Sequence, residues 1–167
     1  MSIELLKRVL LFVAFVLAQA LVLGRIHLFH CATPLLYVYF VTMFPRNYPK
    51  WGVLTWSFFM GLTIDIFSNT PGVAAASLTA IGAIQPYFYE LFVPRDSAES
   101  LEPSLVNLGP TKYSYYIVIL VAIYCLLFFT LELFNFDNLV EWLMSVVGST
   151  SITLALIFTF EIAKGKA

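Results

Sequence analysis

The chain alternates long apolar blocks with short polar breaks, and this pattern limits its fold more than any other feature. A helix needs roughly 20 residues to cross a bilayer core of about 30 Å, and each block is close to this length. The breaks contain Pro, Gly, Asn and charged residues, which favour turns. The blocks are Val9–Leu23, Leu28–Phe44, Trp51–Phe67, Val73–Val93, Tyr113–Phe134 and Val140–Ile162. We therefore predict an all-α membrane bundle of six transmembrane helices in one domain, residues 1–167.

Composition excludes an ordinary soluble domain. Of the 167 residues, 60% are hydrophobic and 11% are charged, whereas about 25% of the residues in soluble domains are charged. We expect the aromatic residues, 17% of the chain, at the membrane interfaces and on the lipid-facing surface.

The division between the first two blocks is the weakest. Residues 24–27 form a short connector, and both flanking blocks are near the lower length limit for a span. A tilted or re-entrant hairpin is the alternative to two separate spans here.

The positions of Lys and Arg predict orientation, because basic residues stay on the cytoplasmic side when loops are short. With six spans, only Arg25 falls on the outer side, and the other basic residues share the inner side. These are Lys7, Arg8, Arg46, Lys50, Arg95, Lys112, Lys164 and Lys166. Both termini and the loop 94–112 are therefore predicted to be cytoplasmic. That loop mixes acidic residues with leucines at helical spacing, which fits either an amphipathic segment or a solvated loop.

The third block carries the sharpest polar pattern. Ser57, Gly61 and Asp65 recur every four residues and share one helix face, which Ser68 continues. Asp65 has two interpretations. Either its side chain stabilises the turn that follows, where Pro71-Gly72 starts the next helix, or it binds a ligand or partner.

The fourth block opens with small residues, including Ala76 and Ala80, which allow another helix to approach closely. This predicts a central helix or a partner interface. Gln85 and Pro86 interrupt its inner half. A proline inside a helix marks either a structural kink or the broken helix of a transport site.

Other polar residues give weaker signals. Glu90 and Glu132 lie near opposite ends of the bundle, so they do not form a carboxylate pair. Polar residues 148–153 in the last block are expected to support helix association. His27 and His30 have no evident third ligand, so we expect no metal and no cofactor. The sequence has no glycine-rich nucleotide loop, no GxSxG and no HExxH, and we expect no enzyme.

Two motifs carry a family resemblance. Residues 61–68 read Gly-Leu-Thr-Ile-Asp-Ile-Phe-Ser, and they precede Pro71, Gly72 and the small-residue helix. Residues 44–49 read Phe-Pro-Arg-Asn-Tyr-Pro in a predicted inner loop. With the six-span layout, these motifs resemble the rod shape-determining membrane protein family MreD over essentially the full length.

The resemblance implies a non-catalytic scaffold of the bacterial elongation complex in the inner membrane. Its partners would be the bitopic protein MreC and, directly or through it, MreB, RodA and penicillin-binding protein 2, linking the cytoskeleton to peptidoglycan synthesis and cell shape. A homodimer stays open, and no nucleic acid is expected. The family is also similar to the substrate-binding subunits of energy-coupling-factor transporters, which implies a shared six-helix fold.

Two alternatives to the scaffold remain at this point. The first is a small-solute-binding membrane subunit of a transporter, with its ligand near Asp65 and the Pro86 kink. The second is a lipid-modifying enzyme using Asp65 or Glu132, which lacks an evident partner base, metal cluster or nucleophile.

Overall fold

The computed structural model describes residues 2–22, 33–97, 100–133 and 138–166, and these residues form helices and no strand. The all-α prediction is therefore confirmed for the described part of the chain. The elements are α1 Ser2–Leu17, η1 Ala18–Val22, α2 Val38–Thr42, α3 Lys50–Ser68, α4 Val73–Phe92, α5 Leu105–Leu108, α6 Pro110–Glu132 and α7 Leu139–Lys166. The element η1 is a π-helical turn that continues α1.

Four described helices are long and apolar enough to cross a membrane, which indicates a membrane protein. They are Ile3–Val22, Lys50–Ser68, Pro110–Glu132 and Leu139–Gly165. They match the first, third, fifth and sixth predicted blocks. Helix α4 matches the fourth block and has 20 residues, but it is not among the four because its small and polar residues lower its hydropathy. The count of six spans stays a prediction.

The second predicted block differs from a spanning helix. Helix α2 covers only Val38–Thr42, and residues 33–37 are not helical. A continuous helix over Leu28–Phe44 is therefore wrong at residues 33–37, while residues 28–32 lie outside the described part. Pro34 gives the physical reason, since a proline pushes the residue before it into an extended conformation.

The extended stretch before α2 donates backbone hydrogen bonds to buried side chains of α7. The amide of Thr33 donates to Ser149 Oγ at 3.0 Å. The amide of Leu35 donates to Thr153 Oγ1, also at 3.0 Å. Non-helical backbone inside a membrane protein requires such partners, because an unsatisfied amide costs several kcal/mol there. Two of the hydroxyls expected to support helix association therefore hold a non-helical segment instead, and those of Thr150 and Ser151 bond back within α7.

A third partner comes from the π-helical turn. The Nε2 of Gln19 donates to the carbonyl of Pro34 at 2.9 Å, and its side chain is buried. The segment 33–44 is thus held by η1 near the N-terminus and by α7 near the C-terminus, and it lies at the centre of the molecule.

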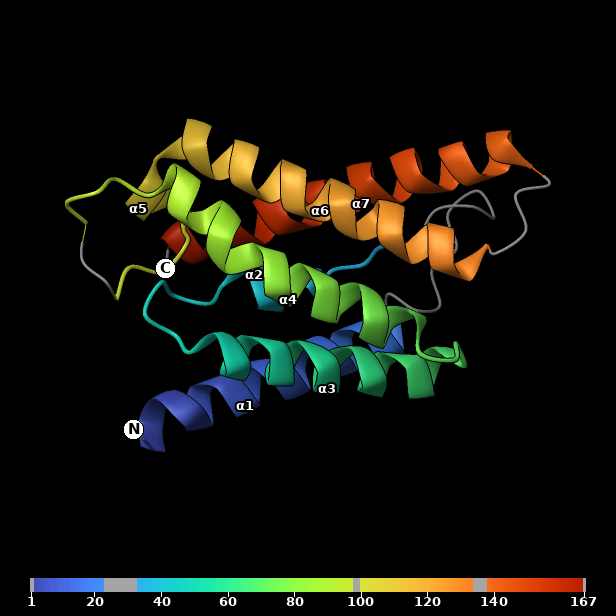
Figure 1. The fold of residues 1–167 in the computed structure, drawn as a ribbon, viewed down its shortest axis with the longest axis horizontal. Helices are drawn as coiled ribbons and strands as arrows, with labels where there is room; N and C mark the ends of the chain where they lie inside the picture. Colours follow the sequence, from blue (N-terminus) through green and yellow to red (C-terminus); the bar gives the residue numbers. More distant parts are fainter. Residues whose placement is uncertain (1, 23–32, 98–99, 134–137, 167) are drawn as a thin grey trace.

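The long helices pack in sequence order around this segment (Figure 1). Helix α4 packs against α3 on one side and against α6 on the other, and α6 packs against α7. The first turn of α1, the turn 43–49, the segment with α5 and the last turn of α7 gather at one end of the molecule. The turn between α3 and α4 lies at the opposite end. The segments predicted to share the cytoplasmic side are therefore grouped at one end.

The core contains many tyrosines, contrary to the expectation that aromatic residues line interfaces and lipid. The fully buried ones are Tyr37, Tyr39, Tyr89, Tyr113, Tyr116 and Tyr124. Several find polar partners: the hydroxyls of Tyr37 and Tyr124 bond to each other, and the Tyr89 hydroxyl donates to the carbonyl of Leu101 at 2.9 Å. Tyrosine fits such a core because its ring packs like phenylalanine while its hydroxyl satisfies irregular backbone.

Replacing Thr153 with valine should destabilise the fold, because the Leu35 amide would lose its acceptor. We expect a loss of about 1–3 kcal/mol in the free energy of unfolding, measured in detergent micelles. Thr159→Val is the matched control, since the Thr159 hydroxyl is exposed and bonds only to Ala155 within α7. Equal stability of the two variants would contradict the anchoring role of Thr153.

Candidate functional site

The carboxylate of Asp65 caps helix α4. Its Oδ1 accepts from the amide of Ala74 at 2.9 Å and from the Thr70 hydroxyl at 2.6 Å. Its Oδ2 accepts from the amide of Ala75 at 2.8 Å. The side chain is 5% exposed. The negative charge also faces the positive end of the α4 dipole, so the turn-stabilising interpretation of Asp65 accounts for every contact it makes.

The turn after α3 has the residues that this geometry requires. Asn69 adopts a left-handed conformation with φ 57°, and its amide donates to the Asp65 carbonyl. Gly72 has φ 79° directly before α4. Asparagine and glycine tolerate positive φ better than other residues. Pro71 and Gly72 are exposed and therefore serve the turn rather than the core.

Ser57 and Gly61 belong to the contact between α3 and α4. A Cβ added at Gly61 would lie 2.6 Å from the carbonyl oxygen of Ala74, so a side chain at this position must push α4 away. Ser57 is fully buried beneath Gly82, and its hydroxyl donates to Val53 within α3 at 2.7 Å. The predicted stripe is therefore an internal helix interface. Ser68 does not continue it, because it is exposed where α3 ends.

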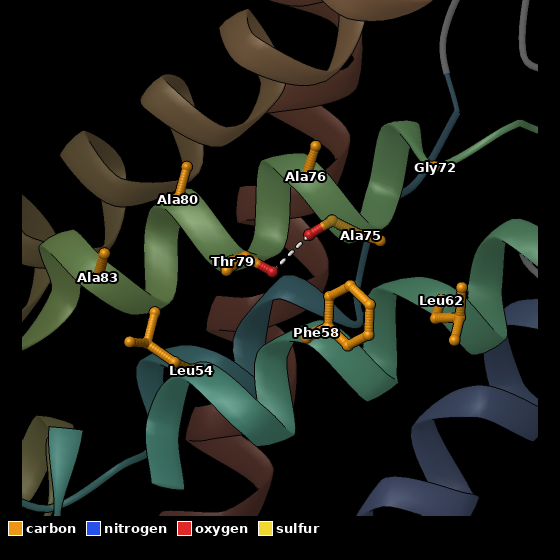
Figure 2. A pocket seen from close by; sticks show the side chains of 9 residues that line it. All are labelled: Leu54, Phe58, Leu62, Gly72, Ala75, Ala76, Thr79, Ala80 and Ala83. Carbon is orange, nitrogen blue, oxygen red and sulfur yellow. Dashed lines mark hydrogen bonds between the residues drawn. The ribbon is translucent and has the colours of Figure 1, made fainter. Parts of the chain in front are cut away.

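Ala76 and Ala80 lie on the outer side of the same hairpin, where α3 and α4 form an open groove of about 530 Å³ (Figure 2). Small residues of α4 form one wall, and larger apolar residues of α3 form the other. The lining residues are Leu54, Phe58, Leu62, Gly72, Ala75, Ala76, Thr79, Ala80 and Ala83. The one hydroxyl among them, Thr79 Oγ1, donates to the Ala75 carbonyl at 2.6 Å. The groove thus presents an apolar surface with its polar groups satisfied.

Gln85 and Pro86 lie far from Asp65. Gln85 is buried, and its Nε2 donates to the Phe44 carbonyl at 3.2 Å and to the Tyr116 hydroxyl at 3.0 Å. Helix α4 continues through Pro86 to Phe92. Pro86 is 11 residues beyond Ala75, which Asp65 caps, so the two features are about 16 Å apart along the helix. They do not form one ligand site.

The structure also contains a buried acid that the sequence reasoning missed. Glu161 of α7 is 4% exposed. Its Oε2 accepts from the Tyr39 hydroxyl, and its Oε1 accepts from the Leu105 amide at 3.2 Å. Glu161 therefore joins α2 to the segment before α6. The signal that could have found it is the four-residue spacing from Ser149 through Thr153 and Ile157, which places all of them on one buried face.

Glu90 and Glu132, the other two acids considered from the sequence, are exposed. Glu90 lies near the end of α4, and Glu132 is the last residue of α6. Helices α4 and α6 run in opposite directions in Figure 1, so these residues lie at opposite ends of the bundle, as predicted. His27 and His30 lie outside the described residues. Within the described part, no cluster of three His, Cys, Asp or Glu could hold a metal.

Comparisons with known proteins add no relative. No family model, curated protein or solved structure matches the chain. The structure itself defines the class of protein: the described residues form a helical membrane protein. Helices α3 and α4 are closely packed on the inner side of their hairpin and form a groove on the outer side.

Asp65→Asn should weaken the hairpin, because an asparagine side chain would turn an NH₂ donor toward an amide of α4. We expect a loss of about 1–3 kcal/mol in stability and faster hydrogen exchange at residues 74 and 75. Glu90→Gln is the control, since it removes the same charge from an exposed position. Unchanged exchange in Asp65→Asn would argue against the capping role.

Gly61→Leu should separate α3 from α4, because the new side chain overlaps the Ala74 and Ala75 backbone. We expect a loss of at least about 1–3 kcal/mol, seen as a lower midpoint of thermal unfolding in detergent. Gly165→Leu is the matched control, because a Cβ there meets nothing within 4 Å. A Gly61→Leu protein as stable as this control would refute the close packing.

Proposed function

We propose that this chain is a non-catalytic membrane scaffold whose α3–α4 groove receives the transmembrane helix of a partner. The observation that carries the proposal is the groove itself, which is open, apolar and lined by alanines along one wall. Within a membrane, helices associate by close packing and not by escape from water, so small residues mark where backbones can meet.

The rigidity of the hairpin supports this role. Asp65 fixes the start of α4 against α3 through two hydrogen bonds and accepts a third from Thr70 in the turn, and Gly61 lets the two backbones approach closely. A groove between two helices that cannot move apart has a fixed shape. A fixed shape reduces the ordering cost of binding.

The chemistry of the groove favours an apolar helix over a polar solute. Its hydroxyl is already bonded within α4, and its lining contains no charged side chain. Small-molecule sites usually carry a few convergent polar groups that fix the ligand. The transporter alternative has less support, since Asp65 and Pro86 serve separate parts of the structure.

The identity of the partner comes from the sequence resemblance to MreD. We propose MreC as the occupant, with MreB, RodA and penicillin-binding protein 2 reached through it or by direct contact. The scaffold would then serve peptidoglycan synthesis and cell shape in the bacterial inner membrane. The grouping of the basic segments at one end (Figure 1) supports cytoplasmic termini in this arrangement.

Leucine at Ala76 or Ala80 should fill the groove and reduce recovery of MreC. The measurement is copurification of tagged protein from its native host in mild detergent, with partners quantified by mass spectrometry. We expect recovery to fall about tenfold, which corresponds to 1.4 kcal/mol of binding, while thermal stability stays unchanged.

Ala155→Leu is the matched control, because Ala155 is an exposed alanine on α7 outside the groove. It should copurify MreC like the wild type. Full recovery of MreC with the groove variants would exclude this groove as the interface. An ATPase module in place of the wall-synthesis proteins would support the transporter alternative.

A further inference from the structure

The proposed scaffold role leaves the motif at residues 44–49 without a function, and Arg8 lies directly against it. The guanidinium carbon of Arg8 is 4.9 Å from the centre of the Phe44 ring and 4.2 Å from that of Tyr48. The two rings are themselves 4.9 Å apart, at an interplanar angle of 42°. Both rings therefore hold one cation, an arrangement that fixes its position without an opposite charge.

The surrounding residues hold this platform in place. The Tyr48 hydroxyl accepts from Trp56 Nε1 at 3.0 Å. A Cβ at Gly52 would lie 2.6 Å from the Tyr48 ring, so the glycine makes room for the ring on α3. Phe44 is buried. The tyrosine ring is thus fixed by a hydrogen bond, by a glycine and by a buried neighbour.

The hydrogen-bonding groups of Arg8 are not used by the described part of the chain. No hydrogen bond or ion pair of Arg8 occurs there, even though Glu4 lies one helical turn earlier on α1 and is exposed. Arginine has five N–H donors in a planar fork that matches the oxygens of a phosphate or carboxylate. A half-buried guanidinium with free donors is therefore suited to an external anion.

The position of Arg8 along α1 indicates where that anion would come from. Arg8 directly precedes the apolar block that begins at Val9, so it lies at a shallow depth near the start of the first candidate span. This depth is near the boundary between headgroups and acyl chains, where long basic side chains reach out to the interface. The turn 43–49 beside it carries one more exposed cation, Arg46. The next cation, Lys50, begins α3, and its ammonium lies 4.3 Å from the centre of the Tyr87 ring on α4.

We propose that Arg8, held on the Phe44–Tyr48 platform, binds the phosphate of an anionic phospholipid headgroup. The guanidinium fork donates to the phosphate oxygens, and Arg46 in the adjoining turn adds positive charge at the same end of the molecule. The lipid then links α1 to the turn between α2 and α3. The site is independent of the groove and of its occupant.

Lipid binding to the purified full-length chain tests the proposal. The protein in neutral detergent is titrated with phosphatidylglycerol, phosphatidylcholine or inorganic phosphate, and bound species are counted by native mass spectrometry. We expect the wild type to retain phosphatidylglycerol in preference to phosphatidylcholine. Arg8→Gln should weaken this binding about fivefold or more, whereas the control Lys7→Gln, which removes the neighbouring exposed charge, should change it less than about twofold.

Three other outcomes would overturn the proposal. Equal losses in the two variants would mean a diffuse basic surface, and competition by inorganic phosphate would mean a site for a soluble anion. A less stable Arg8→Gln protein with unchanged lipid preference would mean that Arg8 only holds α1 to the turn. If Arg8→Gln does not fold, Arg8→Lys decides: it keeps the cation over the rings but loses the fork, so weaker binding supports the site and unchanged binding refutes it.

Discussion

The hairpin depends on the three hydrogen bonds that the Asp65 carboxylate accepts, two from the start of α4 and one from Thr70 in the turn. The first amides of a helix have no partner within the helix, and those of Ala74 and Ala75 belong to buried residues. A carboxylate from the preceding helix satisfies two of them and the hydroxyl of Thr70 at once. Because the backbone carbonyl of Asp65 also accepts from the amides of Asn69 and Thr70 just after α3 ends, this one residue holds both the turn and the start of α4.

The same requirement explains the centre of the molecule. The stretch before α2 is not helical, so its amides need acceptors, and α7 supplies hydroxyls at Ser149 and Thr153. Glu161 continues this buried face and reaches both Tyr39 and Leu105. Several buried polar side chains therefore bond irregular backbone, whereas many Ser and Thr hydroxyls bond back within their own helix. The outer groove of the hairpin is different, because its lining is apolar and its one hydroxyl, that of Thr79, is already hydrogen-bonded within α4.

Much of the helical layout could be predicted from the sequence, because block length and Pro or Gly breaks are local signals. The spacing of Ser57, Gly61 and Asp65 also predicted a shared face, and Pro71-Gly72 predicted the start of α4. The break at residues 33–37 was missed, since an apolar block shows no sign of a non-helical core segment except Pro34. Periodicity alone also could not tell which partner a small residue meets. Gly61 therefore looked equivalent to Ala76 although one is internal and the other faces the groove.

Glu161 was missed for a related reason. It lies near the end of the last block, where an acid normally reaches water, and only the fold brings Tyr39 and Leu105 to it. The prediction also placed the core tyrosines wrongly. Aromatic residues in general prefer membrane interfaces, but this preference does not show which tyrosine hydroxyls find hydrogen-bond partners inside the bundle.

In the proposed complex, a partner helix lies in the groove on the outer side of the α3–α4 hairpin. The most direct measurement is photocrosslinking in the native host from a photoreactive side chain at Ala83, which is exposed in the groove, compared with one at Ala155 on α7. We expect the photoreactive side chain at Ala83 to capture the transmembrane segment of MreC and the one at Ala155 not to capture it. Capture of lipid alone from Ala83, or of MreC equally from both positions, would contradict this placement.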